Sequence, residues 1–207
     1  MKAARQFGGL LVLAVLGAIM GTLGDQIHTQ FRVLTYPRGV WWLFGQAAWV
    51  PFLFAGAGPL LIHGHRLSAW MAGGEREHLT KGGIWMPTLW HFAAYLSTGL
   101  FFTSPRLLTA GLVLAWLGRV AFRPHRAMVV HSLVCAVGGP IFEGFLSSTG
   151  AFTYAHPDFI VPMWLPALYL HVAPVCRHIY VAWVSPPAVI PTTEAPGYLS
   201  LKNLDQP

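Results

Sequence analysis

Residues 7–23 read FGGLLVLAVLGAIMGTL, a run without a charged side chain between Arg5 and Asp25. A bilayer core of about 30 Å requires about 20 helical residues, so this run predicts a transmembrane helix. Five more predominantly apolar intervals follow, at 39–62, 83–103, 107–117, 127–145 and 159–184. The interval 107–117 is short, and it reaches spanning length only if Arg119 extends its side chain to the membrane surface.

The composition of the 207-residue chain also indicates a membrane protein. Hydrophobic residues make up 55% of the chain and charged residues only 10%, whereas soluble domains carry about 25% charged residues. Within lipid, only helices and closed barrels satisfy their own backbone hydrogen bonds. Barrel strands are alternating segments of about ten residues, and the long unbroken runs here predict helices instead. The expected fold class is therefore all-α, a polytopic bundle of six transmembrane helices.

The distribution of basic residues predicts the orientation of the bundle. Six spans place ten of the 13 Lys and Arg residues on one side, leaving Arg32, Arg38 and Arg106 on the other. Basic residues concentrate in cytoplasmic loops, so we expect both termini in the cytoplasm. The formal net charge of +6 does not indicate nucleic-acid binding, because the basic residues are scattered between apolar runs.

Two regions at the ends of the chain need separate interpretation. The first run could be a cleaved signal peptide, since Lys2 and Arg5 precede it, but no small-x-small cleavage site precedes Asp25. Its Gly17-Ala-Ile-Met-Gly21 pattern favours close helix packing and would also allow self-association. We therefore expect a six-helix transmembrane domain over residues 1–184. The proline-rich residues 185–207 are expected to be a flexible cytoplasmic tail.

Polar side chains inside predicted spans are costly in lipid and are functional candidates. They are Gln46, His91, His131, Glu143, His171 and His178. His131 and Glu143 lie twelve residues apart on one predicted helix, about 18 Å along its axis, so they cannot share a metal ion. No metal site is predicted, and the two cysteines, Cys135 and Cys176, are expected to be small core residues.

Glu143 has two interpretations. It follows Gly138-Gly139-Pro140, where a kinked helix would free backbone carbonyls for a proton or cation site of a transporter. The simpler interpretation, which we favour, is a carboxylate near the outer surface, solvated or paired with a basic group such as Arg32.

The nine Trp, 13 Phe and six Tyr residues supply a second class of candidates. Tyr36, Trp41 and Trp42 fit an interfacial aromatic belt. Trp49, Trp90 and Trp116 lie deeper in predicted spans. Deep tryptophans beside Gly and Ala are consistent with a cavity for a hydrophobic ligand and equally with ordinary packing, and the pattern alone does not choose.

Two motifs resemble a known family. Gln26-Ile-His-Thr-Gln-Phe-Arg-Val-Leu-Thr-Tyr-Pro37 precedes Ala48-Trp49-Val50-Pro51, and Phe152-Thr-Tyr-Ala-His-Pro-Asp158-Phe159 precedes Trp164-Leu-Pro166. Their order and spacing resemble the insulin-induced-gene (Insig) family of endoplasmic-reticulum membrane proteins, over about residues 20–180. His91 is similar in place to a family Asn-His-Ala segment.

This resemblance implies six helices with cytoplasmic termini and a lipid-binding, non-catalytic role. Animal members bind oxysterols and retain an escort protein and a sterol-synthesis reductase in the membrane. Where animal members carry Phe-Asp-Arg after the fourth span, this chain has Phe122-Arg123-Pro124. An acidic partner-binding position is therefore basic here, which puts the escort interaction in doubt. The chain resembles a bacterial or distant member, and the bacterial inner membrane is then the expected location.

The resulting functional prediction is a non-catalytic protein that binds a diacylglycerol-like lipid or a sterol between its helices, without another cofactor. The expected ligand-binding residues are Gln26, Trp42, Gln46, Trp49, Trp90, His91, His131 and Glu143. A membrane-protein partner and a homodimer or homotrimer remain open.

Two other functions are alternatives. One is an intramembrane lipid-modifying enzyme using His91, His131 or Glu143 for proton transfer, and the other is a small transporter using Glu143. A non-catalytic role is favoured because no pair of ionisable groups is expected at a common depth and within reach for acid–base chemistry.

Prolines supply a hypothesis for the cavity. Pro51 and Pro166 are expected to bend the second and sixth helices, because proline removes a backbone donor, and bent helices would leave a gap for a lipid tail. Asp158 is expected to cap the sixth helix.

Overall fold

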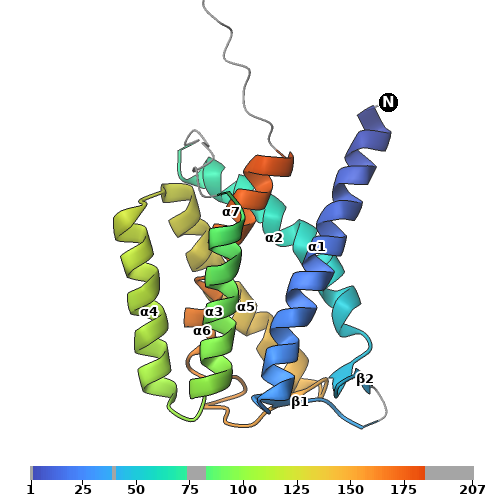
Figure 1. Cartoon of the computed structure of the whole chain (residues 1–207), viewed down its shortest axis with the longest axis vertical. Coiled ribbons are helices and arrows are strands. Elements are labelled where there is room, and N and C mark those ends of the chain that lie inside the picture. The colour runs from blue at the N-terminus through green and yellow to red at the C-terminus, as the bar shows by residue number, and fades with distance from the viewer. Residues whose placement is uncertain (1, 39–40, 74–82, 185–207) are drawn as a thin grey trace, which may run out of the picture.

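The computed structural model of this protein is a bundle of helices with two short antiparallel strand pairings at one end (Figure 1). It describes residues 2–38, 41–73 and 83–184, without the side chains of 2–8, 41–43 and 183. Five long helices precede an interrupted C-terminal segment. They are α1 (Lys2–Gln30), α2 (Val50–Met71), α3 (Trp85–Phe101), α4 (Pro105–Phe122) and α5 (Arg126–Ser148), followed by α6 (Leu165–Tyr169), α7 (Ala173–Ile179) and the π-helix η1 (Tyr180–Val184).

The bundle presents apolar side chains on its outside. Exposed large residues include Leu11 on α1, Phe52 on α2, Leu89 on α3, Leu107 on α4 and Phe145 on α5. An apolar surface of this extent is unfavourable in water and suits lipid. Within the described ranges, three segments are long and apolar enough to cross a membrane by length and composition alone: Gly9–Gln30, Pro105–Phe122 and Arg126–Ser148.

The fourth helix is longer than its apolar core suggested, since α4 extends from Pro105 through Arg119 to Phe122. The start of α1 and the end of η1 lie at the same end of the bundle, opposite the end that carries β1 (Figure 1). A chain that crosses the membrane an even number of times has both ends on the same side, so this arrangement agrees with the predicted even number of spans.

The second predicted span was wrong at its N-terminal end. Trp41–Leu43 (β2) pairs with Gln46–Ala47 (β3) instead of joining a helix. The turn between them requires a positive φ of 85° at Gly45, which glycine adopts without strain. The helix α2 begins only at Val50, with Pro51 in its first turn, where a missing backbone donor costs nothing.

The sixth predicted span, 159–184, is also wrong as a single helix. Asp158 does not cap it. The Asp158 carboxylate accepts a hydrogen bond from the backbone N–H of Met163 at 2.6 Å, in the turn before α6. Pro166 then lies in the first turn of α6. Because Pro51 and Pro166 both begin helices, neither bends one midway. The prolines inside helices are Pro59 in α2 and Pro140 in α5.

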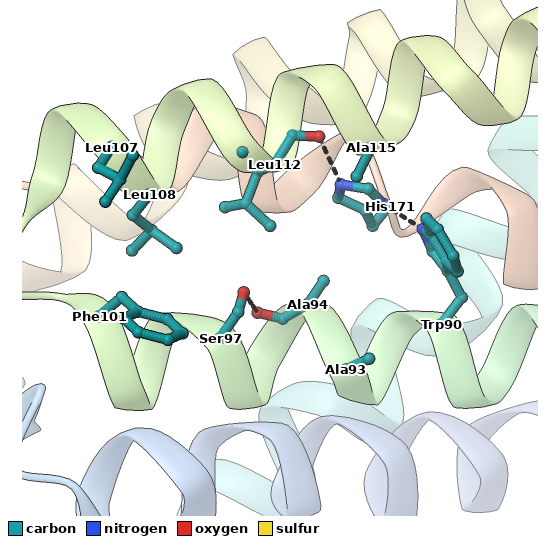
Figure 2. Close-up of a pocket in the computed structure, with 11 residues that line it drawn as sticks. Trp90, Ala93, Ala94, Ser97, Phe101, Leu107, Leu108, Leu112, Ala115 and His171 are labelled. Carbon is teal, nitrogen blue, oxygen red and sulfur yellow. Dashed lines mark hydrogen bonds between the residues drawn. The ribbon is translucent and has the colours of Figure 1, made fainter.

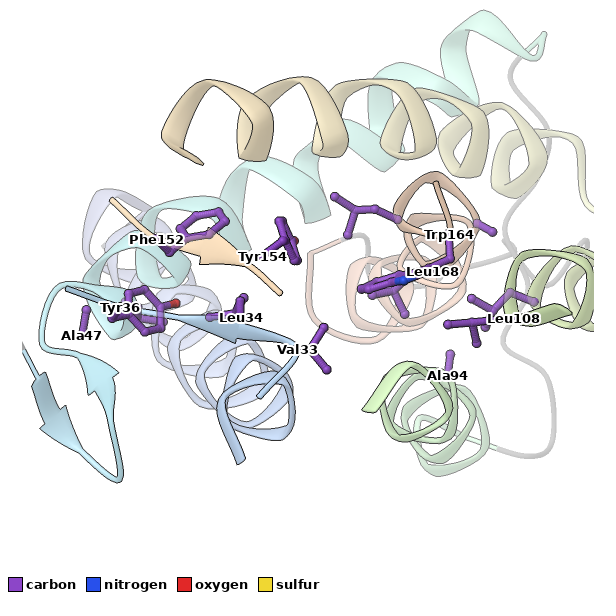
Figure 3. Close-up of a cluster of buried hydrophobic side chains, with 14 residues drawn as sticks. Val33, Leu34, Tyr36, Ala47, Ala94, Leu108, Phe152, Tyr154, Trp164 and Leu168 are labelled. Atoms are coloured by element: carbon purple, nitrogen blue, oxygen red, sulfur yellow. The ribbon is translucent and has the colours of Figure 1, made fainter. Parts of the chain in front are cut away.

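A small β-pairing and a buried cluster close the end of the bundle opposite the N-terminus. The strand β1 (Leu34–Thr35) pairs antiparallel with β4 (Thr153–Tyr154). Around this pairing, buried side chains from both halves of the chain meet, as Figure 3 shows. They include Val33, Leu34, Tyr36, Phe152, Tyr154, Trp164 and Leu168. The two motifs that carried the family resemblance are thereby brought together.

Glycines bring α1 and α2 into close contact. A Cβ atom at Gly17 would lie 2.7 Å from the Cα of Gly58, and one at Gly21 would overlap the ring of Phe54. The small-residue pattern of the first helix therefore serves packing within the chain, as predicted. The same face is not available for contact between copies.

Candidate functional site

A cavity of about 690 Å³ lies between α1, α2, α5 and α7. Most of its wall is apolar, with Leu16 and Met20 from α1, Leu53 from α2, and Val175 from α7. His131 and Glu143 both line it from α5. Since twelve residues separate these two, the cavity extends about 18 Å along the helix axis. It is long enough to hold much of an acyl chain or a fused-ring body.

The cavity reaches the outside of the bundle between α2 and α5. Five large apolar residues that line the cavity are also exposed, and all five belong to these two helices: Leu60, Leu67, Met71, Val134 and Phe142. Gly56 and Gly138 are exposed at the same border and have open space beside their Cα atoms. The opening therefore faces the surrounding lipid.

Polar groups gather at one end of this cavity, near the C-terminal end of α1. Asp25 is buried, and its carboxylate accepts hydrogen bonds from the Tyr36 hydroxyl at 2.7 Å and from the Gln46 side-chain amide at 2.6 Å. The same Gln46 amide donates to the backbone carbonyl of Thr22 at 3.1 Å. Burial, reinforced by the Asp25 carboxylate, raises the pKa of the Tyr36 phenol well above its usual value. Tyr36 therefore stays a hydrogen-bond donor.

Glu143 forms the second half of this polar end. Its carboxylate accepts hydrogen bonds from the hydroxyls of Tyr154 and Tyr169, the latter at 2.5 Å. Burial and the adjacent Glu143 carboxylate raise the pKa of the Tyr154 phenol well above its usual value. The basic partner predicted for Glu143, such as Arg32, was therefore wrong. Two tyrosines donate hydrogen bonds to its carboxylate instead. Tyr36, Tyr169, Asp25 and Glu143 all line the cavity.

Histidines occupy two places along the wall. His91 on α3 is 7% exposed, and the centroid of its ring lies 5.0 Å from that of the Tyr95 ring, near the polar end. His131 on α5 lies beside His65 of α2, with ring centroids 5.6 Å apart. Among the described residues, the Nδ1 atoms of His91 and His131 have no hydrogen-bond partner. Both histidines line the cavity.

A second, smaller cavity of about 420 Å³ lies between α3 and α4 (Figure 2). The Trp90 indole donates to Nδ1 of His171 at 2.9 Å, and His171 Nε2 lies 3.1 Å from the carbonyl oxygen of Leu112. Since Nδ1 accepts, Nε2 must carry the proton and donate to that carbonyl. His171 is therefore a neutral connector of α3 and α4, with both ring nitrogens in use.

The predicted ligand-binding residues divide into four groups. Trp49, His91, His131 and Glu143 line the large cavity, and Trp90 lines the small one. Gln46 hydrogen-bonds to Asp25, and Gln26 hydrogen-bonds to the backbone carbonyl of Phe44 at 3.4 Å; neither is among the lining residues of these two cavities. Trp42 lies in β2, but its side chain is outside the described residues.

The remaining polar and aromatic candidates serve packing. The Trp116 indole donates to the hydroxyl of Ser132 at 3.2 Å, and His178 Nδ1 lies 2.8 Å from the carbonyl oxygen of Pro174.

Sequence reasoning missed much of the polar end. Asp25 was treated only as the charge that ends the first apolar run. Tyr95 and Tyr169 were not predicted, because an isolated tyrosine in an apolar sequence carries no distinctive pattern, and Tyr154 was noted only as part of the Phe152–Phe159 motif. The expectation that no two ionisable groups share a depth is wrong, since Asp25 contacts Tyr36 and Glu143 contacts Tyr169. A hint was available in the Gln26–Pro37 motif, which places Tyr36 near Asp25.

The fold is similar to that of solved bacterial structures. The crystal structure of the Insig homologue MvINS from Mycobacterium vanbaalenii matches with a TM-score of 0.71 at 23% sequence identity, over 83% of this chain and 92% of that chain. A cross-linked trimer of MvINS matches with a TM-score of 0.71 at 22% identity, over 86% of this chain and 96% of that chain. No protein-family model and no curated protein matches the chain.

The expectation drawn from the two motifs is thus confirmed at the level of architecture. The helix bundle, its apolar exterior and the match over most of both chains agree with one another. This chain is an integral membrane protein with the fold of the mycobacterial Insig homologue.

Proposed function

We propose that this chain is an Insig-type membrane protein that binds one amphiphilic lipid in the cavity between α1, α2, α5 and α7, without catalysing a reaction. The observation that carries the proposal is the polarity gradient of this cavity. Its long apolar wall suits a hydrocarbon body, and its end at Asp25 and Glu143 suits a hydrogen-bonding head group. Its volume of about 690 Å³ is within the range of sites for single small molecules, roughly 300–1,000 Å³.

The direction of the opening supports a membrane-derived ligand. A lipid can enter between α2 and α5 without leaving the bilayer, because the exposed lining residues on that border are apolar. The family resemblance favours a diacylglycerol-like lipid or a sterol, with both termini in the cytoplasm. The polar end would then face the outer leaflet. The cross-linked trimer of MvINS supports a homo-oligomer of this chain. A membrane protein that this chain regulates would be a further partner.

An enzymatic alternative follows from the grouping of carboxylates and tyrosines at one end of the cavity, where proton transfer over hydrogen-bond distance is geometrically available. We favour binding because each carboxylate is already held by two donors from the protein. Identifying the co-purified lipid by mass spectrometry tests both. Recovery of one dominant intact amphiphile supports binding, and conversion of that lipid on incubation would establish the enzyme instead.

Filling the mouth of the cavity is expected to reduce lipid binding. Gly138 borders the opening on α5, and a Cβ atom added there would have no other atom within 4 Å, so Gly138→Phe can fold while its ring obstructs entry. Because obstructing contacts cost about 1–3 kcal/mol, lipid affinity should fall about tenfold or more. Titration with a diacylglycerol carrying a fluorescent acyl chain measures the effect.

Val137→Phe is the matched control, because the Val137 side chain is 62% exposed one residue earlier and does not line the cavity. Its affinity should equal that of the unmodified protein. Equal affinities for Gly138→Phe and Val137→Phe would remove this entrance from the proposal.

A further inference from the structure

We infer that the end of the bundle that carries the N-terminus binds the phosphate of an anionic phospholipid, on an arginine cluster formed by Arg119, Arg123 and Arg177. None of the three arginines lines either cavity, and the inference does not depend on the occupant of the large one. It follows from the convergence of three basic side chains, from the distribution of acidic residues and from the apolar surface beside the cluster.

Hydrogen bonds fix the relative heights of the segments that carry the cluster. The Trp116 indole of α4 donates to the Ser132 hydroxyl of α5, which donates to the backbone carbonyl of Leu170 at 3.0 Å. From this tie, both α4 and the C-terminal segment run toward the end that carries the N-terminus (Figure 1). Arg123 lies seven residues beyond Trp116, and Arg177 lies seven beyond Leu170. At about 1.5 Å per residue, both lie about 10 Å past the tie.

Electrostatics and burial join the three side chains into one cluster. Arg119 lies one helical turn before Arg123, whose backbone N–H donates to the Arg119 carbonyl at 3.0 Å. The charges of Arg123 and Arg177 both act on Arg119. Arg177 is only 7% exposed, Arg119 is half-buried and Arg123 is exposed. A guanidinium group stays protonated in proteins, and like charges shielded from water repel more strongly, so an anion bound among them would relieve the repulsion.

The acidic side chains that the structure describes lie away from this cluster, toward the end of the bundle that carries β1. They are Asp25, Glu143 and Asp158. The connection between α2 and α3, outside the described residues, carries Glu75 and Glu77 but also Arg76 and Lys81, so it adds no net negative charge. The tendency of basic residues to gather in cytoplasmic loops does not explain a buried arginine beside another on a neighbouring helix. The charge of this end therefore favours an anionic ligand.

The surface beside the cluster favours a lipid over a free anion. On the last turns of α4, Leu117 and Phe122 are 48% and 89% exposed, so apolar side chains border the arginines on the outside of the bundle. The chains of a phospholipid would lie along this border. The planar fork of an arginine pairs with two phosphate oxygens at once. Basic pockets between transmembrane helices on the cytoplasmic side bind anionic head groups, and the charge pattern predicts that this end is cytoplasmic.

The test compares two phospholipids with the same chains and differently charged head groups. Radiolabelled dioleoyl phosphatidylglycerol and dioleoyl phosphatidylcholine are titrated at neutral pH onto the purified full chain in mild non-ionic detergent, with bound lipid measured by scintillation proximity. Because one basic residue near an anionic surface strengthens binding about fivefold, we expect phosphatidylglycerol to bind at least about tenfold more tightly. Equal affinities would overturn the inference.

Variants assign the preference to the arginine cluster. Arg119→Gln and Arg123→Gln each remove one charge, and each should reduce the preference for phosphatidylglycerol about fivefold. Arg106→Gln is the matched control, because Arg106 is exposed at the other end of the same helix, and it should retain the full preference. A preference that survives in both cluster variants, or that falls equally in Arg106→Gln, overturns the assigned site. The comparison of the two lipids on the unmodified chain decides the anion preference even if a variant misfolds.

Competition separates this site from the large cavity and from a site for free anions. Unlabelled dioleoylglycerol has the same chains without a phosphate and should not displace phosphatidylglycerol. If it did, the phospholipid would occupy the large cavity and the assigned site would be wrong. Inorganic phosphate at the concentration of the lipid should displace little of it, and complete displacement would overturn the lipid assignment. If radiolabelled dioleoylglycerol and sterol failed to bind while phosphatidylglycerol bound, the proposed function would be wrong and this inference would stand.

Discussion

Trp164→Ala is expected to lower the free energy of unfolding by about 3–5 kcal/mol, the usual cost of removing a large buried aromatic side chain. Trp164 is only 1% exposed and precedes α6 at the end of the bundle opposite the N-terminus. Its loss would leave a void where the two halves of the chain meet, and the surrounding side chains would lose their dispersion contacts.

The contacts of Trp164 explain why neighbouring groups cannot fill this void. Its ring lies edge-on to His28 of α1 at 5.6 Å and to Tyr154 of β4 at 6.2 Å between centroids. His28 is fixed by Thr98 of α3 at 2.7 Å, and Tyr154 is fixed by Glu143. Figure 3 shows the ring of Trp164 between Tyr154 and Leu168 in the same cluster. Both His28 and Tyr154 are held by hydrogen bonds that collapse into the void would break.

Thermal stability in detergent, followed by fluorescence-detected size exclusion, measures the effect. Trp70→Ala is the matched control, since Trp70 on α2 is 75% exposed and its removal should change stability little. If both variants lost the same stability, the burial of Trp164 in this cluster would not be the cause of its loss.

The sequence predicted most of the helix bundle because lipid imposes a simple rule. Uninterrupted apolar runs must satisfy their backbones as helices, and α1, α3, α4 and α5 follow this rule closely. The prediction failed at 41–49 and 159–164, where the chain forms strands, turns and bends instead of helix. Irregular backbone is possible outside the hydrocarbon region of a membrane, and apolar composition alone does not distinguish such a segment from a span.

The candidate site was less predictable than the fold. Trp49, His91, His131 and Glu143 were found because polar or bulky residues inside a span are conspicuous. Asp25 and Tyr36 lie on either side of the end of α1, and Tyr169 lies in a helix of only five residues. Their roles depend on contacts between segments far apart in the chain, such as Tyr169 with Glu143. Periodicity and spacing carry no information about such contacts.

Gly17→Leu is expected to separate α1 from α2 and to abolish both the stable fold and the large cavity. A Cβ atom at Gly17 would lie 2.5 Å from the backbone oxygen of Phe54 and 2.7 Å from the Cα of Gly58. Backbone atoms cannot rotate away as a flexible side chain can, so one helix must move. Overpacking of this kind costs about 1–3 kcal/mol where side chains adjust, and a clash with backbone should exceed that range.

Gly9→Leu provides the matched comparison on the same helix, because no atom lies within 4 Å of a Cβ at Gly9. Leu favours helix over Gly by roughly 0.5–1 kcal/mol, so this variant should be as stable as the unmodified chain or slightly more stable.

Gly58→Leu should reproduce the loss from the other side of the contact, because its Cβ would lie 2.8 Å from the Cα of Gly17. The amount of protein that remains monodisperse after a heat step ranks the stability of the three variants. Equal losses at Gly9 and Gly17 would show that helix contact is not the reason these glycines are needed. Since Gly17 and Gly58 also line the cavity, a stable Gly17→Leu protein that still bound lipid would contradict the packing of α1 against α2 described above.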